Sequence, residues 1–256
     1  MRNKLTELFE HKNNRLLNIY CTAGYPHLES TSEVLIALQK HGADMIEIGM
    51  PYSDPIADGP VIQQSNMTAL QNGMTISLLF RQLNKVKDKI TVPLILMGYF
   101  NPVLQYGLEK FCKDAAAAGV VGIIIPDMPM YEYETTYKPI FEHHNLSFIF
   151  LITPQTSDER IKQADELSSG FLYAVSSSST TGNALDTNDQ TEYFKRISQM
   201  KLKNPIMIGF GINNRQTFDV ACEYAAGAII GSAYIKALSN DDDINGVTAA
   251  FITAIK

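Results

Sequence analysis

The sequence contains no tryptophan, only three cysteines and no long apolar run. Cys21, Cys112 and Cys222 lie far apart and form no C-x-x-C pair, which favours buried thiols in a reducing compartment over disulfides or a zinc site. Residues 1–18 are polar and of mixed charge. We therefore expect neither a secretory signal nor a membrane span, and we expect the chain to act in the cytoplasm.

A surplus of basic residues is also missing. The formal net charge of the 256 residues is −6, and no run of lysine or arginine interrupts this balance. A surface that binds nucleic acid is therefore not expected. A phosphorylated ligand would need a local positive site that the fold itself provides.

Short apolar runs, typical of strands, alternate along the chain with stretches of helical spacing such as 61–88 and 104–118. The apolar runs lie at about residues 16–21, 44–50, 93–98, 120–125, 146–152, 170–175, 205–209 and 226–230. Strands that are apolar on both faces and alternate with helices form parallel sheets. The pattern predicts one α/β domain over 1–256, a closed (β/α)8 TIM barrel with extra helices at 2–12 and 242–256, in preference to an open doubly wound sheet.

Glu47 lies in the second expected strand, between Ile46 and Ile48. Barrel enzymes carry their catalytic groups at the carboxyl ends of strands and in the loops that follow. A carboxylate in an apolar strand is costly to bury, and desolvation raises its pKa toward the range of a general acid. We interpret Glu47 as a catalytic acid; a structural ion pair on the outer face of the strand is the alternative.

Asp58 lies in the loop after this strand, within S-D-P-I-A-D-G-P. Asp54 is a rival carboxylate, although its place before Pro55 also suits a turn. Asp58, which precedes Gly-Pro, could likewise serve only a turn. Two carboxylates at one barrel mouth would permit paired acid and base chemistry, and we expect Glu47 and Asp58 to form that pair.

Glycine-containing loops follow the last three expected strands, at Thr181-Gly182, Gly209-Phe210-Gly211 and Gly231-Ser232. Glycine lets the backbone approach an anion closely, and a helix that begins at Ser232 would direct its N–H groups at that anion. Barrels often bind phosphate in these loops. The pattern favours a phosphate site over ordinary strand-to-helix turns.

Two kinds of catalytic group are missing from the expected strand ends. No lysine ends a strand, so a Schiff-base mechanism is unsupported. No His, Asp or Glu cluster has metal-ligand spacing, so we expect no metal site. His143 and His144 end a helical stretch, where we expect them to be solvated.

Six motifs resemble those of the tryptophan synthase alpha subunit family, in the order expected for it. They are TAGYP (22–26), EIGMPYSDPIADGPVIQ (47–63), LMGYFNPV (96–103), IPDMP (125–129), GFGI (209–212) and GSAYIK (231–236). The resemblance implies a lyase that reversibly cleaves indole-3-glycerol phosphate to indole and glyceraldehyde 3-phosphate. It also implies an αββα heterotetramer in which indole is channelled to a β subunit that makes L-tryptophan. Pyridoxal phosphate (PLP) would belong to that partner, with no cofactor in this chain.

The resemblance also assigns roles to residues. Glu47 matches the acid/base catalyst, Asp58 the carboxylate that meets the indole N–H, and Tyr173 a tyrosine near the catalytic glutamate. The implied indole pocket and lid comprise Tyr20, Leu96, Ile124, Leu151, Tyr173, Thr181 and Phe210. The implied phosphate contacts are Gly182, Gly211, Gly231 and Ser232. Barrel-core packing is the alternative for each apolar member of the pocket.

The sequence departs from the family pattern at a few positions. Ser177 and Ser179 stand in the lid where the family often carries Arg and Gly, and Tyr20 stands where Phe is common. The resemblance places the loop 51–60 and the segment at Asn101-Pro102 against the β subunit. Two other functions stay open: another phosphate-binding barrel enzyme, or a catalytically weak subunit that mainly activates its partner.

Overall fold

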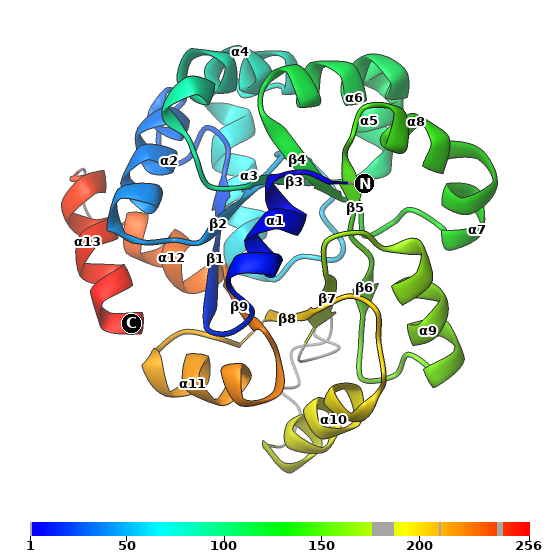
Figure 1. Cartoon of the computed structure of the whole chain (residues 1–256). Helices are drawn as coiled ribbons and strands as arrows, with labels where there is room; N and C mark the ends of the chain where they lie inside the picture. Colours follow the sequence, from blue (N-terminus) through cyan, green and yellow to red (C-terminus); the bar gives the residue numbers. More distant parts are fainter. Residues whose placement is uncertain (1, 176–186, 210, 240–242) are drawn as a thin grey trace.

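The computed structural model describes residues 2–175, 187–209, 211–239 and 243–256. Parallel strands form a ring surrounded by helices, and Figure 1 views this ring nearly end-on. The strands are β1 (Leu16–Thr22), β2 (Met45–Gly49), β3 (Leu94–Met97), β4 (Val120–Ile124), β5 (Ser147–Phe148), β6 (Leu151–Ile152), β7 (Leu172–Val175), β8 (Ile206–Gly209) and β9 (Gly227–Ile230). Their hydrogen-bonded order is β5-β4-β3-β2-β1-β9-β8-β7-β6.

The ring is closed by one segment that the sequence predicted as a single strand, 146–152. Its first half, β5, pairs with β4, and its second half, β6, pairs with β7. Between the halves the Ile149 N–H donates to Ile123 O at 3.0 Å, and the Tyr173 N–H donates to Phe150 O at 3.1 Å. The two short strands are therefore one interrupted strand, and the expected eight-stranded barrel is confirmed.

The helices cover the outside of the ring. They are α2 (Ser30–His41), α3 (Pro60–Gln71), α4 (Ile76–Val86), α5 (Phe100–Tyr106), α6 (Leu108–Ala117), α7 (Met130–Glu132), α8 (Lys138–His143), α9 (Asp158–Leu167), α10 (Thr187–Gln199), α11 (Arg215–Tyr224) and α12 (Ser232–Leu238). The stretches 61–88 and 104–118 each form two helices rather than one. Gly73 and Gly107, with φ of +92° and +90°, stand at the breaks, because that left-handed region favours glycine over other residues.

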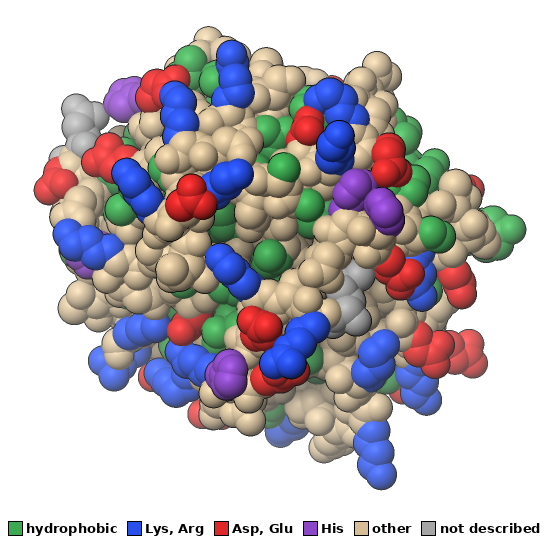
Figure 2. Space-filling model, turned by 45° about the horizontal axis from the view of Figure 1, so that its top comes forward, with side chains coloured by type: hydrophobic (Ala, Val, Ile, Leu, Met, Phe, Trp, Pro, Cys, Tyr) green, Lys and Arg blue, Asp and Glu red, His purple; other side chains and the backbone are tan. Residues whose placement is uncertain are grey.

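The strands bury side chains on both faces, as parallel strands under helices must. One buried cluster fills the inside of the ring and includes Leu16, Met45, Ile95 and Met207. A second and larger cluster lies between the strands and the helices. On the outer surface acidic and basic side chains are interspersed over the face shown in Figure 2, in keeping with the absence of a basic cluster from the sequence.

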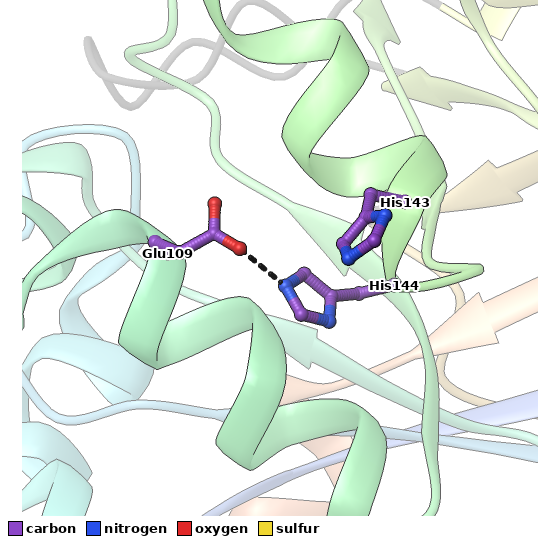
Figure 3. A group of neighbouring side chains, drawn as sticks. All are labelled: Glu109, His143 and His144. Carbon is purple, nitrogen blue, oxygen red and sulfur yellow. Dashed lines mark hydrogen bonds and ion pairs between the residues drawn. The ribbon is translucent and has the colours of Figure 1, made fainter.

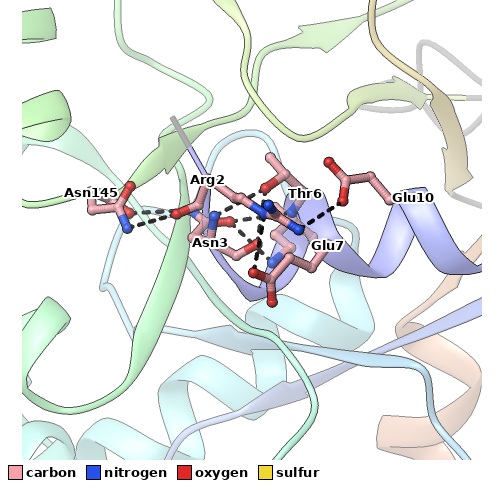
Figure 4. A network of polar contacts seen from close by, with 7 residues as sticks. Arg2, Asn3, Thr6, Glu7, Glu10 and Asn145 are labelled. Carbon is pink, nitrogen blue, oxygen red and sulfur yellow. Dashed lines mark hydrogen bonds and ion pairs between the residues drawn. The ribbon is translucent and has the colours of Figure 1, made fainter.

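The two expected terminal helices are present as α1 (Lys4–His11) and α13 (Ile244–Ile255). α1 lies in front of the ring in Figure 1, and Leu5 is fully buried against the inner cluster. Figure 4 shows Asn3 at the start of α1, with polar contacts to the first turn and to Asn145. The Asn3 side-chain oxygen accepts from the N–H groups of Leu5 and Thr6, and its Nδ2 donates to Val121 O, Asn145 O and Ser147 Oγ at 3.0–3.1 Å.

Replacing Asn3 with Ala should therefore weaken the attachment of α1 to the barrel and lower the stability of the protein. The variant loses a helix cap, which contributes about 1 kcal/mol, and leaves buried acceptors without their donor. We expect the free energy of unfolding in urea to fall by about 2–4 kcal/mol. Asn13→Ala, at an exposed asparagine, is the control and should change it by less than about 0.5 kcal/mol. Equal losses in the two variants would contradict this account.

Candidate active site

A cavity of about 220 Å³ lies where the carboxyl ends of β1, β2, β3, β7 and β9 meet the loops that follow β2 and β8. Its lining combines two carboxylates, two tyrosines and a glycine-rich backbone edge. The lining residues are Tyr20, Glu47, Asp58, Ile62, Met97, Tyr173, Gly211, Ile212, Asn213, Ile229, Gly231, Ser232, Ala233 and Lys236. The sequence placed chemistry at this end of the barrel, and the cavity agrees with that.

Glu47 is fully buried and lines this cavity, so the alternative of an ion pair on the outer face is wrong. Burial raises the pKa of its carboxyl from 4.5 to about 8, partly opposed by a hydrogen bond from Asn18. At neutral pH the group is therefore mostly protonated. A protonated carboxyl on the wall of a cavity can give a proton to a bound molecule and take one back.

Asn18 is a polar residue in β1 that faces Glu47. Its Nδ2 donates to Glu47 Oε2 at 3.2 Å, and both side chains are fully buried. Among the described residues, Glu47 Oε1 and Asn18 Oδ1 have no hydrogen-bond partner. Buried polar atoms are nearly always paired, and Glu47 lines the cavity, so its Oε1 is available to a ligand there.

Asp58 is positioned by a tyrosine from the next strand. Tyr99, which follows β3, donates from its hydroxyl to Asp58 Oδ2 at 2.9 Å and accepts from the Ala57 N–H at 3.0 Å. Burial raises the pKa of Asp58 from 3.8 to about 6, and the Tyr99 hydrogen bond opposes the rise. Asp58 therefore remains largely ionised at neutral pH. The rival carboxylate, Asp54, is exposed, bonded to Ser53 and outside the cavity lining.

Tyr20 and Tyr173 have 4% of their surface exposed, and each lies beside a glycine of the neighbouring strand. A Cβ at Gly49 would overlap the Tyr20 ring, and a Cβ at Gly209 would overlap the Tyr173 ring. The two glycines therefore let the aromatic rings lie flat across the strand ends. This arrangement gives the cavity aromatic walls beside Glu47.

The lining of the cavity also includes the loop after β8 and the start of α12. Gly211, with φ of +76°, follows β8, and Gly231 with Ser232 leads into α12. The first N–H groups of a helix have no acceptor within the helix and carry its positive dipole end. The structure thus brings Gly211, Gly231 and Ser232 together with both carboxylates, as the sequence predicted.

Other expected pocket residues lie elsewhere. Leu96 belongs to the cluster between strands and helices, so its expected place in the pocket is wrong, and Met97 lines the cavity instead. Ile124 and Leu151 belong to or pack against the inner cluster but do not line the cavity. The expected site residues outside the described part of the chain are Thr181, Gly182 and Phe210, together with the lid residues Ser177 and Ser179.

The sequence analysis also missed residues that the structure brings to the site. Asn18 carried a signal, because it is polar within the apolar run RLLNIY, two residues before Tyr20. Met97 would have followed from the strand register, in which Gly49 pairs with Met97. Lys236, one turn into α12, lines the cavity although no lysine ends an expected strand.

Because burial favours the protonated form of Glu47, the protein should lose stability as the pH rises. The folded-state pKa of about 8 lies above the ordinary 4.5, so the folded chain binds more protons than the unfolded chain between these values. Glu47→Gln should match the wild type near pH 4.5. At pH 8.5 it should be more stable in urea, by roughly 4 kcal/mol at about 1.4 kcal/mol per pH unit.

The control for this experiment is Glu33→Gln, which removes an exposed carboxylate of α2. Its free energy of unfolding should track that of the wild type at both pH values. A Glu47→Gln variant with no gain at pH 8.5 would show that the buried carboxyl has an ordinary pKa.

Within the described residues of the chain, no helix is both long and apolar enough to cross a membrane.

The chain is similar to known proteins over nearly its whole length. A family model for the tryptophan synthase alpha chain matches residues 6–255. The tryptophan synthase alpha chain of Flavobacterium psychrophilum is 55% identical over 239 residues, which cover 93% of each chain. That of Parabacteroides distasonis is 50% identical over 240 residues, again 93% of each chain.

Solved structures give the same result. A crystal structure of the tryptophan synthase alpha chain from Legionella pneumophila has a TM-score of 0.89 at 31% identity, covering 100% of this chain and 96% of that one. Tryptophan synthase from M. tuberculosis in its aminoacrylate-bound form has a TM-score of 0.86 at 30% identity, covering 100% of both chains. Sequence and fold agree over nearly the whole length, and the chain belongs to the tryptophan synthase alpha chain family.

Proposed function

We propose that this chain, acting as one barrel domain over residues 1–256, cleaves indole-3-glycerol phosphate reversibly into indole and glyceraldehyde 3-phosphate. The observation that carries the proposal is that Glu47 and Asp58 line one cavity together with Gly211, Gly231 and Ser232. An indole ring suits the aromatic and carboxylate part of that lining. A phosphate suits the N–H groups of the glycine-containing part.

In this proposal Glu47 carries both proton transfers. Its carboxyl, protonated at neutral pH, gives its proton to C3 of the indole ring, which becomes an iminium ion. The resulting carboxylate takes the proton of the side-chain hydroxyl next to that carbon. The O–H electrons form the aldehyde C=O, the C–C bond breaks, and its electrons neutralise the iminium ion. Glu47 ends the cycle as it began.

Asp58 has an electrostatic role in the same cycle. It is ionised when Glu47 is protonated, because its pKa is about 6 and that of Glu47 about 8. Tyr99 occupies its Oδ2, so Oδ1 is the atom that would accept the indole N–H. A carboxylate held there stabilises the positive charge that develops on the ring.

The remaining contacts belong to the same proposal. Tyr173 and Tyr20 would flank the indole ring, with Met97 in the place first expected for Leu96. The resemblance alone assigns Ile124 and Leu151 to the pocket, together with Thr181 and Phe210, which lie outside the described part of the chain. Gly182, also outside that part, is expected to contact the phosphate.

We further propose that the chain works in the cytoplasm with a β subunit, in the αββα assembly of its family. Each of the two segments assigned to that interface exposes an apolar side chain. Ile56, in the loop 51–60, is 72% exposed, and Leu104 in α5 is 45% exposed. The loop 51–60 also carries Asp58, so a partner seated on this loop would contact the segment that supplies one of the two cavity carboxylates. PLP would be bound by that partner, and the proton transfers proposed for this chain do not involve PLP.

Two other functions lead to different measurements. A barrel enzyme that forms a Schiff base would be trapped by borohydride reduction of the substrate complex, whereas the mechanism proposed here forms no covalent intermediate. A subunit that serves only to activate its partner would release no indole when assayed alone.

Glu47→Gln should abolish most of the indole release by the isolated chain, because the amide can neither give nor take the proton. We expect kcat/KM to fall at least 100-fold, the usual contribution of a general acid or base. Glu33→Gln, an exposed carboxylate in α2, should retain the wild-type rate. A wild-type rate of indole release in Glu47→Gln would contradict this mechanism.

The rate should also depend on pH in a way that Asn18 controls. With Asp58 ionised above pH 6 and Glu47 protonated below pH 8, kcat/KM should be highest between about pH 6 and 8.

Asn18→Leu removes the donor to the Glu47 carboxylate and raises the pKa of Glu47 further. The alkaline limb should therefore move up by about one pH unit while the acidic limb stays, since one charged hydrogen bond contributes about 1.5–3 kcal/mol.

Asn13→Leu, at an exposed asparagine, serves as the control for this profile. An alkaline limb that stays in place in Asn18→Leu would mean that Asn18 does not tune the catalytic carboxyl.

A further inference from the structure

Three side chains with metal-binding atoms meet on the outer surface of the barrel, away from the cavity. They are Glu109 in the first turn of α6, His143 at the end of α8, and His144 directly after it. Figure 3 shows all three side chains turned toward one another across the gap between the two helices. One ligand atom from each residue lies within 4.8 Å of the other two.

The sequence predicted no metal site because Glu109 stands 35 residues before His144. The fold removes that separation by packing α6 against α8. His144 Nε2 lies 2.8 Å from Glu109 Oε1, so this pair is already in place. The side chain of His144 is only 14% exposed, and Glu109 and His143 reach it from the solvent side.

The backbone that carries the two histidines is fixed by its neighbours. The His144 N–H donates to Ile140 O at 3.3 Å, and the Asn145 N–H donates to Glu142 O at 3.0 Å. The Asn145 side chain donates to Arg2 O at 3.1 Å, next to the α1 cap. Two imidazoles on a fixed helix end lose less conformational freedom when they bind an ion than they would on a loose loop.

We propose that Glu109, His143 and His144 form a binding site for a divalent transition-metal ion of the zinc type. Two imidazole nitrogens and one carboxylate oxygen are a donor set that suits zinc, whereas magnesium and calcium prefer oxygen alone. Ligand atoms at about 2.0–2.1 Å from a tetrahedral ion lie roughly 3.4 Å apart. The Glu109–His144 pair is near that spacing, and rotation of the exposed His143 side chain brings in the third atom.

A simple ion pair explains only part of this cluster. A cationic histidine near the end of α8 would interact favourably with the helix dipole and with Glu109. The His143 ring packs edge-on against the His144 ring with centroids 4.9 Å apart, where two positive charges would repel each other. A metal ion bound by two neutral rings uses both histidines.

The site would act on stability rather than on the proposed reaction. Its ligands join the ends of two helices on the outside of the barrel, and none of them lines the cavity. An ion that binds the folded chain and not the unfolded chain raises the melting temperature by mass action. Zinc should therefore raise the melting temperature and leave the rate of indole release unchanged.

The test uses the full chain, freed of metal with a chelator and titrated with zinc chloride by calorimetry and by thermal unfolding. We expect one zinc ion per chain, a micromolar Kd and a higher melting temperature. His143→Ala and Glu109→Gln should each weaken binding at least tenfold. His11→Ala is the matched control, since His11 also ends a surface helix, and it should bind zinc as the wild type does.

Cobalt chloride gives a second measurement, because visible absorption bands of tetrahedral cobalt should appear in the wild type and disappear in His143→Ala. Magnesium chloride should produce no heat and no change in melting temperature. The proposal is overturned if zinc binds the wild type no more tightly than it binds His143→Ala and Glu109→Gln. These readouts do not depend on indole release, so they stand whatever the outcome for the proposed reaction.

Discussion

The ring of parallel strands buries the Glu47 side chain completely, and most properties of the site depend on that burial. Full burial moves the pKa of that carboxyl to about 8, so the group is mostly protonated at neutral pH. Asp58 sits in a loop at the edge of the same ring and is less deeply buried, so its pKa rises only to about 6. Two residues of one chemical type thus differ in charge because one lies in a strand and the other in a loop.

Much of this could be predicted from the sequence, because the relevant signals are local. Apolar runs at regular intervals predicted the barrel, a carboxylate inside such a run predicted Glu47, and glycines after the last strands predicted Gly211 and Gly231. Each of these patterns reflects the burial or the backbone conformation of a short segment, and both can be recognised from the residues of that segment alone.

What the sequence could not supply is the phase of each strand and the contacts between distant segments. Leu96 and Met97 are equally apolar, and only the pairing of β3 with β2 decides which one faces the cavity. Tyr99, in the segment after β3, positions Asp58, which lies 41 residues earlier in the loop after β2. Glu109 meets His144 only because two helices pack together. Each of these follows from tertiary packing rather than from any periodicity along the chain.

The two tyrosine–glycine contacts at the barrel mouth repeat one geometry. Tyr20 lies over Gly49, the partner of Thr22, and Tyr173 lies over Gly209, the partner of Val175. In both cases a ring from one strand fills the volume that the next strand gives up, two residues further along. The two residues of each pair are therefore expected to change together during evolution. A larger residue fits at either glycine only where a smaller side chain stands in place of the tyrosine.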